Sequence, residues 1–443
     1  MNGFVAIKTL FKGNYERTIE HLSSLYSDKD ALIKAIEEIL FTWLKPEEIR
    51  GKKVLLKPNW VKHNSVSQDE ICLRTNDQFL LAAIEVVLKM SPSYVLIGDA
   101  PIQGCIWAIM ISSSFVDEIK KLGTKYNIKV EVIDFRRTIF NPSVKIPIHE
   151  IRPISEYIIF DIAKKSFLEP ITKKDKKLFR VTNYDPNRLA ESHSPGVHKY
   201  CITRELFKAD VVISLPKVKT HQKAGITAAL KNIVGLNGDK DFLPHHRLGG
   251  TGFGGDCYPG RNILRYWSEL VLDFANRHQG KLSYPFSCNL SKLLWNLSFP
   301  GNEHNIAAGW YGNDTTWRMV LDLNLIAVYG RADGTLADTP QRNLFCLCDG
   351  IIGGQGDGPL NPEPLPLGII SFTNNSMIND QAMAILMNLS IAKIPLLNAT
   401  CFYNTIKDYN VILNGAIVSL EELRSHSIIT KPPKGWISHF KIN

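Results

Sequence analysis

The chain has 443 residues, of which 44% are hydrophobic and 21% are charged, and this balance excludes an intrinsically disordered protein. Lysine and arginine (52) outnumber aspartate and glutamate (43), which gives a net charge of +9. The basic residues are spread along the chain, without a recognition helix, a zinc finger or an RNA-binding aromatic motif. The charge therefore favours a small anionic ligand over nucleic acid.

The sequence shows neither a membrane span nor a secretory signal. No stretch approaches the roughly 20 apolar residues that cross a bilayer, and residues 1–15 lack the pattern of a signal peptide. We therefore expect a cytoplasmic protein with no membrane partner. The eight cysteines include no Cys-x-x-Cys pair, so we expect neither a zinc ribbon nor an iron–sulfur cluster. The sequence leaves the oligomeric state open.

An amphipathic helical pattern over 29–44 dominates the start of the chain. Ser27 and Asp28 precede it, and Pro46 follows it. These are typical start and stop signals of a helix. The sequence therefore predicts an N-terminal helical segment over residues 1–50.

Short apolar runs that end in polar residues alternate with helical patterns over the next part of the chain and again near its end. Continuous apolar strands that alternate with helices indicate a parallel sheet with both faces covered. The predicted fold is α/β, with a mostly parallel sheet flanked by helices and with core parts at 51–242 and 331–443. The predicted strands are 54–56, 94–98, 130–133, 211–215, 344–348 and 367–372, and the predicted helices are 77–90, 115–122, 226–236 and 380–391.

Residues 243–330 break this rhythm, because they are glycine-rich at first and then helical with many aromatics. We expect a helical insertion here. The glycine-rich stretch 249–255 has no strand before it, so we interpret it as a mobile loop or lid and not as a dinucleotide fingerprint. The aromatic residues are expected to belong mostly to the core: Tyr266, Trp267, Trp295, Trp310 and Trp317.

The most informative stretch is 209–238, where cationic side chains follow a predicted strand. After Pro216, Lys217, Lys219, His221 and Lys223 occupy every second position. In an extended loop these side chains would share one face. A predicted helix from 226 adds free N–H groups and a positive dipole end. The pattern predicts an anion site for a phosphate or a carboxylate, although solvated loop lysines are the simpler alternative for any single residue.

Within this site we assign roles by side-chain chemistry. A lysine that is crowded by cations has a lowered pKa and can titrate near neutral pH, which arginine effectively cannot. A histidine is a natural proton carrier. The candidate catalytic residues are Lys219, His221 and Lys231, and the candidate substrate-binding residues are Lys57, Asn59, Lys217, Thr227 and Asn232.

The acids at the other strand ends are candidates for a metal site. Asp99, Asp349 and Asp380 beside a phosphate would suit Mg²⁺, but the sequence leaves open whether a metal is required. The His245-His246 pair is a further candidate, with an ordinary pair of loop histidines as the alternative. Residues 354–359 form either a backbone anion nest or a structural turn.

Taken together, these motifs resemble the "domain of unknown function 362" family of bacterial and archaeal proteins. The matching elements are K-P-N-W (57–60), G-D-A-P (98–101), 209–221, 225–235, 349–359 and the acid of N-D-Q-A (379–382). The resemblance implies a shared polar site without an agreed reaction. Some relatives append a cysteine-rich iron–sulfur segment that this chain lacks. They also tend to have Gly-x-Asp-Pro before the last acid, where this chain departs from the pattern, which leaves the role of Asp380 uncertain.

Two classes of function fit these features. The first is an enzyme that acts on a phosphorylated or carboxylated metabolite by transfer, ligation or lyase chemistry. The second is a non-catalytic protein that binds an anion or a nucleotide. Acids and bases in one cleft favour the enzyme, because a simple anion binder gains nothing from nearby carboxylates.

Overall fold

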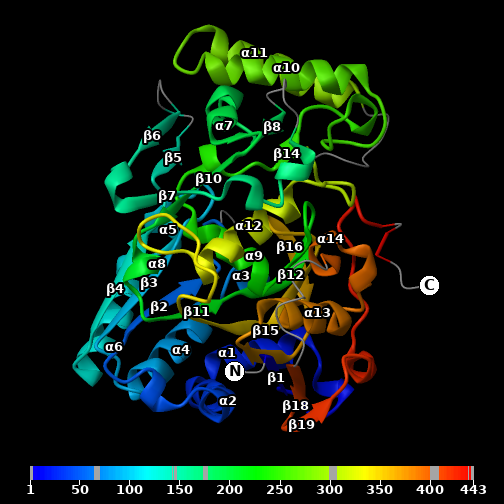
Figure 1. The fold of residues 1–443 in the computed structure, drawn as a ribbon. Helices are drawn as coiled ribbons and strands as arrows, with labels where there is room; N and C mark the ends of the chain where they lie inside the picture. The colour runs from blue at the N-terminus through cyan, green and yellow to red at the C-terminus, as the bar shows by residue number, and fades with distance from the viewer. Residues whose placement is uncertain are drawn as a thin grey trace.

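A computed structural model describes residues 3–63, 70–141, 143, 147–172, 178–298, 307–399, 409–437 and 439–440. Its centre is a 12-stranded sheet with the strand order β19-β18-β1-β17-β15-β11-β2-β3-β4 (Figure 1). The hairpin β12–β13 and the strand β16 attach to β15. The run from β15 to β4 is entirely parallel, as the apolar runs predicted. The other half is mixed, because β17 runs antiparallel to both β15 and β1.

The bounds of the elements agree with most of the predicted strands and helices. The strands of the main sheet are β1 (Gly3–Thr9), β2 (Lys53–Pro58), β3 (Tyr94–Asp99), β4 (Lys129–Asp134), β11 (Val211–Leu215), β12 (Lys217–His221), β13 (Gly225–Thr227), β15 (Asn343–Asp357), β16 (Asn361–Leu365), β17 (Ile369–Thr373), β18 (Tyr409–Leu413) and β19 (Ala416–Val418). The smaller sheets contain β5 (Thr138–Phe140), β6 (Ile148–Glu150), β7 (Tyr157–Asp161), β8 (Phe179–Arg180), β9 (His193–Ser194), β10 (Val197–Thr203) and β14 (His246–Arg247). The helices are α1 (Ile19–Ser27), α2 (Lys29–Trp43), α3 (Glu70–Leu73), α4 (Asp77–Lys89), α5 (Trp107–Met110), α6 (Ser113–Tyr126), α7 (Pro186–Ser192), α8 (Glu205–Lys208), α9 (Ala229–Asn232), α10 (Ile263–Arg277), α11 (Ser283–Leu297), α12 (Thr316–Tyr329), α13 (Ser376–Leu386) and α14 (Pro395–Asn398).

Two buried clusters cover the two faces of the sheet. Along β2, Val54 and Leu56 belong to the cluster that packs under α1, α2, α4 and α6, whereas Leu55 belongs to the other. The second cluster contains residues of α9, α12, α13 and α14. Side chains alternate between the faces of a strand, so the continuous apolar runs fill both clusters, and the predicted fold class is confirmed.

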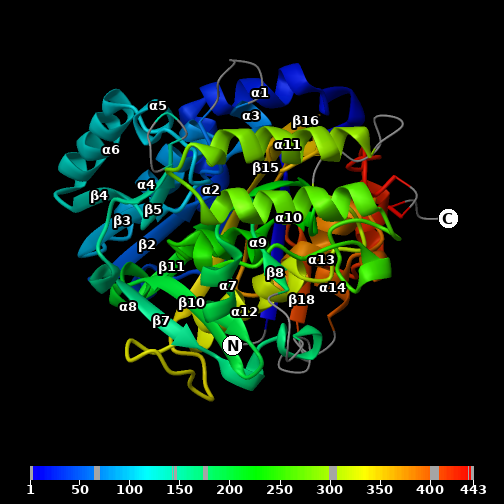
Figure 2. The same ribbon diagram turned by 90° about the horizontal axis from the view of Figure 1, so that it is seen from above.

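The structure differs from the predicted segments in three places. Residues 1–50 are not only helical, because β1 lies inside the main sheet between β17 and β18. The predicted helix 226–236 is instead a hairpin strand, β13, followed by the short helix α9 and a 3₁₀ turn. Within 243–330, α10 and α11 lie on the outside of the molecule, whereas α12 packs into the core (Figures 1 and 2).

Candidate functional site

The carboxyl ends of β2 and β3 are joined by a buried ion pair. Lys57 Nζ lies 2.7 Å from Asp99 Oδ1, and both side chains are buried. The Asp99 carboxylate also accepts hydrogen bonds from the backbone N–H groups of Trp60 (2.7 Å) and Ala100 (2.9 Å). Three donors therefore satisfy Asp99, which fixes the strand ends and leaves little capacity for a metal.

Asn232 of α9 connects this ion pair to the neighbouring strand β11. Its Oδ1 accepts from Lys57 Nζ (3.2 Å) and Asn59 Nδ2 (3.1 Å), and its Nδ2 donates to Lys57 O (3.1 Å) and Ser214 Oγ (2.8 Å). The structure thus brings together three residues that the sequence predicted to bind substrate, Lys57, Asn59 and Asn232. They bind one another, and the two asparagines also line the cavity described below.

A second buried ion pair joins β12 to β15. Lys217 Nζ lies 2.8 Å from Asp349 Oδ2, and both side chains are fully buried. Asp349 also accepts from the Tyr26 hydroxyl (2.5 Å) and the backbone N–H of Asn76 (3.0 Å). Lys217 and Asp349, predicted as a substrate ligand and a metal ligand, are therefore bound to each other away from the cavity.

Lys219 is also buried outside the cavity. Its side chain is fully buried, and its ammonium donates to the carbonyl of Leu73. Burial, with help from Lys217, lowers the pKa of Lys219 to about 7. The register of β12 on β15 shifts between Lys217 and Lys219, so the predicted shared face of alternating cations breaks there.

The N-terminus of α9 is already occupied by a carboxylate of the chain. Asp380 of α13 accepts from the backbone N–H groups of Ala229 (2.8 Å) and Leu230 (2.9 Å). Burial raises the pKa of Asp380 to about 7. The position predicted for an external anion is therefore filled from within, and Asp380 caps a helix and does not line the cavity.

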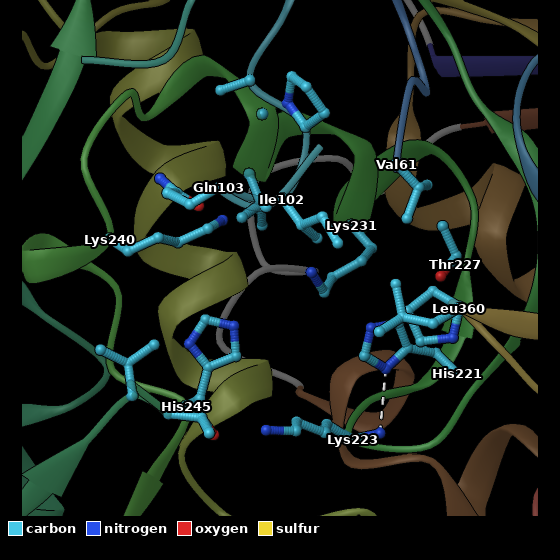
Figure 3. Close-up of a pocket in the computed structure, with 18 of the residues that line it drawn as sticks. Val61, Ile102, Gln103, His221, Lys223, Thr227, Lys231, Lys240, His245 and Leu360 are labelled. Carbon is cyan, nitrogen blue, oxygen red and sulfur yellow. Dashed lines mark hydrogen bonds between the residues drawn. The ribbon is translucent and has the colours of Figure 1, made fainter. Parts of the chain in front are cut away.

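A cavity of about 430 Å³ lies beside these strand ends, and its lining is basic (Figure 3). Lys223, Lys231 and Lys240 line it together with His221 and His245. Figure 3 shows Lys231 reaching into the middle, with the two imidazole rings on opposite sides. None of the three lysine ammonium groups forms a hydrogen bond or an ion pair with a residue that the structure describes. Asp99 is the one carboxylate among the lining residues, and Lys57 already neutralises it.

Burial and mutual repulsion make these lysines titratable. Burial, with the charges of Lys240 and Lys223, lowers the pKa of Lys231 to about 7. Burial lowers the pKa of Lys240 to about 8, and it also lowers the pKa of Lys223. Charged and neutral forms of Lys231 are therefore both present at neutral pH.

The two histidines of the cavity hold opposite tautomers. His221 Nδ1 accepts from the backbone N–H groups of Lys223 (3.0 Å) and Ala224 (3.1 Å), so the neutral ring carries its proton on Nε2. His245 Nδ1 lies 2.7 Å from the carbonyl oxygen of Leu243, which can only accept, so its Nε2 has a free lone pair. Burial and the nearby lysines hold both pKa values well below the ordinary range. His221 can thus donate a hydrogen bond, whereas His245 can accept one.

Uncharged polar groups complete the lining. The side-chain amide of Gln103, Asn59 Oδ1 and Thr227 Oγ1 are buried without a hydrogen-bond partner among the residues that the structure describes. Buried polar atoms are nearly always paired, so these groups are available to a ligand. Val61, Ile102 and Leu360 form an apolar part of the wall (Figure 3).

A group that could hold a metal lies elsewhere in the described part of the chain. One ligand atom each of His246, Cys257 and Glu269 lies within 4.8 Å of the others, and all three residues are buried. In this structure His246 Nε2 and Glu269 Oε1 are 3.2 Å apart and form a hydrogen bond. His246 was half of the predicted histidine pair, whereas His245 faces the cavity.

Sequence reasoning found only part of the cavity. Five of the candidate site residues line it, namely Asn59, His221, Thr227, Lys231 and Asn232. The alternating pattern includes Lys223 but assigns it no role. No sequence pattern predicts Lys240 or Gln103 as a site residue, or the tautomer of His245 that leaves Nε2 unprotonated. The nearness of Lys240 and His245 to the end of the lysine motif is the signal that could have found them.

Among the comparisons with known proteins, one identifies the family, and none adds an activity. No curated protein matches the chain. A crystal structure of a protein from Thermotoga maritima matches with 10% identity and a TM-score of 0.36, over 84% of this chain and 59% of that chain, so the present chain spans about 59% of its length. The family model described as "Domain of unknown function (DUF362)" matches residues 159–385, which include the lysine-containing stretch 209–238. With half of its length matched by this model, the chain belongs to the DUF362 family.

Proposed function

We propose that the protein is an enzyme that acts on an anionic small molecule, a phosphorylated or carboxylated metabolite. One observation carries this proposal: Lys223, Lys231 and Lys240 enter one cavity without a carboxylate partner. These side chains are only partly exposed, and charges that are withdrawn from water in proteins are normally paired. An anionic ligand would supply the missing partners through charge-assisted hydrogen bonds, each of about 1.5–3 kcal/mol.

The size and lining of the cavity support a small metabolite. A volume of about 430 Å³ lies within the usual range of small-molecule pockets. The unpaired amide of Gln103 and the oxygen atoms of Asn59 and Thr227 can recognise polar groups of the ligand. The apolar wall at Val61, Ile102 and Leu360 can contact its carbon skeleton.

The tautomers of the two histidines favour a catalyst over a simple anion trap. A bound anion would offset the lysine charges that lower the pKa of His245, so that Nε2 of this ring, which the carbonyl of Leu243 orients, could take a proton from the substrate. His221 Nε2–H can donate to an oxygen atom on which negative charge develops. Lys231 can serve either as an acid or as an amine base near neutral pH. These proposed roles differ from the predicted ones, in which His221 exchanged a proton and either Lys219 or Lys231 stabilised developing negative charge. Transfer, ligation and lyase reactions all use such steps.

The second candidate is a non-catalytic protein that binds an anion or a nucleotide. It is favoured by the state of Asp99, the one carboxylate among the described residues that line the cavity. Three donors already satisfy this carboxylate, so no free acid opposes the lysines there. The same observation gives no support to a Mg²⁺ site at Asp99, Asp349 and Asp380.

Calorimetry with sulfate and phosphate tests the binding part of the proposal. We expect Lys231→Met to weaken anion binding at least about tenfold, since it removes one charge-assisted bond. The matched control is Lys120→Met, which removes an exposed lysine of α6. If the folded parent protein binds neither anion, the site is refuted.

Turnover separates the two candidate functions. Thermal-shift screening of phosphorylated and carboxylated metabolites would supply a substrate for the assay. His245→Gln should then lower kcat by about 10²-fold or more while ligand affinity changes little. Unchanged kcat together with a raised KM would favour the non-catalytic candidate.

A further inference from the structure

The hairpin of α10 and α11 has an inverted amphipathic pattern. The two helices lie side by side as the outermost layer of the molecule, over α7, β8 and β14 (Figures 1 and 2). Surface helices normally bury their apolar stripe and expose their polar face. Here the buried residues are polar except for Ala275: they are Arg265, Ser268, Glu269, Asp273, Ala275 and Asn276 of α10 and Ser287 and Ser291 of α11.

Polar contacts attach this hairpin to the body of the protein. Asp273 forms a bidentate ion pair with Arg180 of β8, with Nε at 2.9 and 3.1 Å and the nearest terminal nitrogen at 2.8 Å. Glu269 accepts from the backbone N–H of Gly249 at 2.9 Å and contacts His246 at 3.2 Å. Because these bonds hold the polar face inward, the apolar face must point outward.

The outward face exposes large apolar side chains. On α10, Ile263 is 66% exposed and Trp267 is 55% exposed. At the start of α11, Leu282 is 98% exposed and Phe286 is 72% exposed. Leu264, Phe274, Leu293 and Leu297 belong to the same exposed set. Large exposed apolar side chains at helical spacing, such as Ile263 and Trp267 or Leu293 and Leu297, indicate an interaction site. The exposure of Trp267 also corrects the prediction that it belongs to the core.

The exposed charged side chains of the hairpin segment itself all have one sign. Between residues 261 and 298, a segment that the structure describes completely, every exposed charged side chain is basic: Arg261, Arg277, Lys281 and Lys292. Both acids of the segment, Glu269 and Asp273, are buried. Trp, Phe and Leu combined with Lys and Arg are the composition of helices that lie in a membrane interface.

We propose that the outer face of the α10–α11 hairpin binds the surface of a bilayer that contains anionic lipids. No described helix is long and apolar enough to cross a membrane, so the contact is interfacial. A second copy of the chain fits less well, because a two-fold interface would bring the basic side chains of both copies together. The proposal departs from the expected absence of a membrane partner, which rested on the lack of a spanning segment.

Vesicle co-sedimentation of the full-length protein tests this proposal. We expect binding to vesicles of phosphatidylcholine mixed with phosphatidylglycerol, and weaker binding to phosphatidylcholine alone or in high salt. The double variant Trp267→Ser/Phe286→Ser should weaken partitioning by about tenfold or more for each side chain removed. Lys281→Gln/Lys292→Gln should lose most of the preference for the anionic vesicles.

The matched control is Ile417→Ser, which removes a side chain of similar exposure (74%) from β19, far from the hairpin (Figure 1). It should bind vesicles like the parent. All substituted side chains are exposed, so the variants should keep the unfolding midpoint of the parent. Absence of vesicle binding by the parent, or equal binding by the Trp267/Phe286 variant, would overturn the proposal. If the parent is a dimer by light scattering, the Trp267/Phe286 variant is a monomer and neither binds vesicles, the face serves self-association instead.

Discussion

At the scale of single residues, the chain uses lysines in two different ways. Lys57 and Lys217 are neutralised by Asp99 and Asp349 within the sheet. Lys231 and Lys240 enter the cavity without a carboxylate partner. Lys219 lies between these classes, because it is buried with a single carbonyl partner and lines no part of the cavity. Residue type alone therefore cannot separate the binding lysines from the structural ones.

Lys219→Met distinguishes a structural lysine from a catalytic one. The folded pKa of Lys219 is about 7, well below the unfolded value of about 10.4. Above pH 7 the unfolded state therefore binds more protons, and this lysine makes stability rise with pH. Between pH 7 and 10 the free energy of unfolding should therefore rise less steeply in the variant than in the parent, by up to about 1.4 kcal/mol per pH unit. Urea unfolding at several pH values measures the difference. The affinity of the variant for sulfate should equal that of the parent. A tenfold loss of affinity would instead show that Lys219 contributes to anion binding.

At the scale of elements, the turn after α9 packs closely against the carboxyl ends of β2 and β3. Gly235 lies where a Cβ atom would be 1.8 Å from Asp99 Oδ1 and 2.7 Å from Lys57 Nζ. Its carbonyl oxygen accepts from the backbone N–H of Ala100 at 2.9 Å. Glycine is thus required at position 235, because the ion pair leaves no room for a side chain there.

Gly235→Ala should therefore be strongly destabilising. The new methyl group must displace Asp99 or Lys57, and disrupting a buried ion pair costs about 3–5 kcal/mol. Chemical denaturation should show the loss as a lower midpoint. Gly104→Ala is the control, because a Cβ atom there would meet its nearest neighbours, two atoms of Phe140, at 4.0 Å. Similar stability of the two variants would contradict this account of Gly235.

The sequence predicted elements better than it predicted contacts. Continuous apolar runs identified β2, β3 and β11, because burial on both faces leaves a local signal. Of the alternating residues from Lys217 to Lys223, only His221 and Lys223 line the cavity. The alternation could not show that Lys217 pairs with Asp349, 132 positions away, because the register of β12 on β15 decides this. The capping of α9 by Asp380 is equally non-local.

At the scale of the whole molecule, one sheet carries both the fold and the site. Strands from 53–99, 211–227 and 343–373 share this sheet, so the residues of the cavity wall come from distant parts of the chain. The hairpin of α10 and α11 forms an outer layer over β8 and β14 (Figure 1). His245 directly precedes β14, so the same two strands lie next to the cavity wall. A ligand in the cavity would consequently stabilise several segments at once.

The stabilisation of the whole protein by sulfate should therefore depend on pH. Ligand binding to the folded state raises its stability by an amount that grows with affinity. Lys231 and Lys240 have folded pKa values of about 7 and about 8, so both are largely protonated at pH 6 and largely neutral at pH 9. Sulfate remains a dianion throughout this range, so any change must come from the protein. The increase in Tm on adding sulfate should shrink as pH rises from 6 to 9. It should be small at every pH in Lys231→Met/Lys240→Met, and an increment that is constant with pH in the parent would show that neither lysine binds the anion.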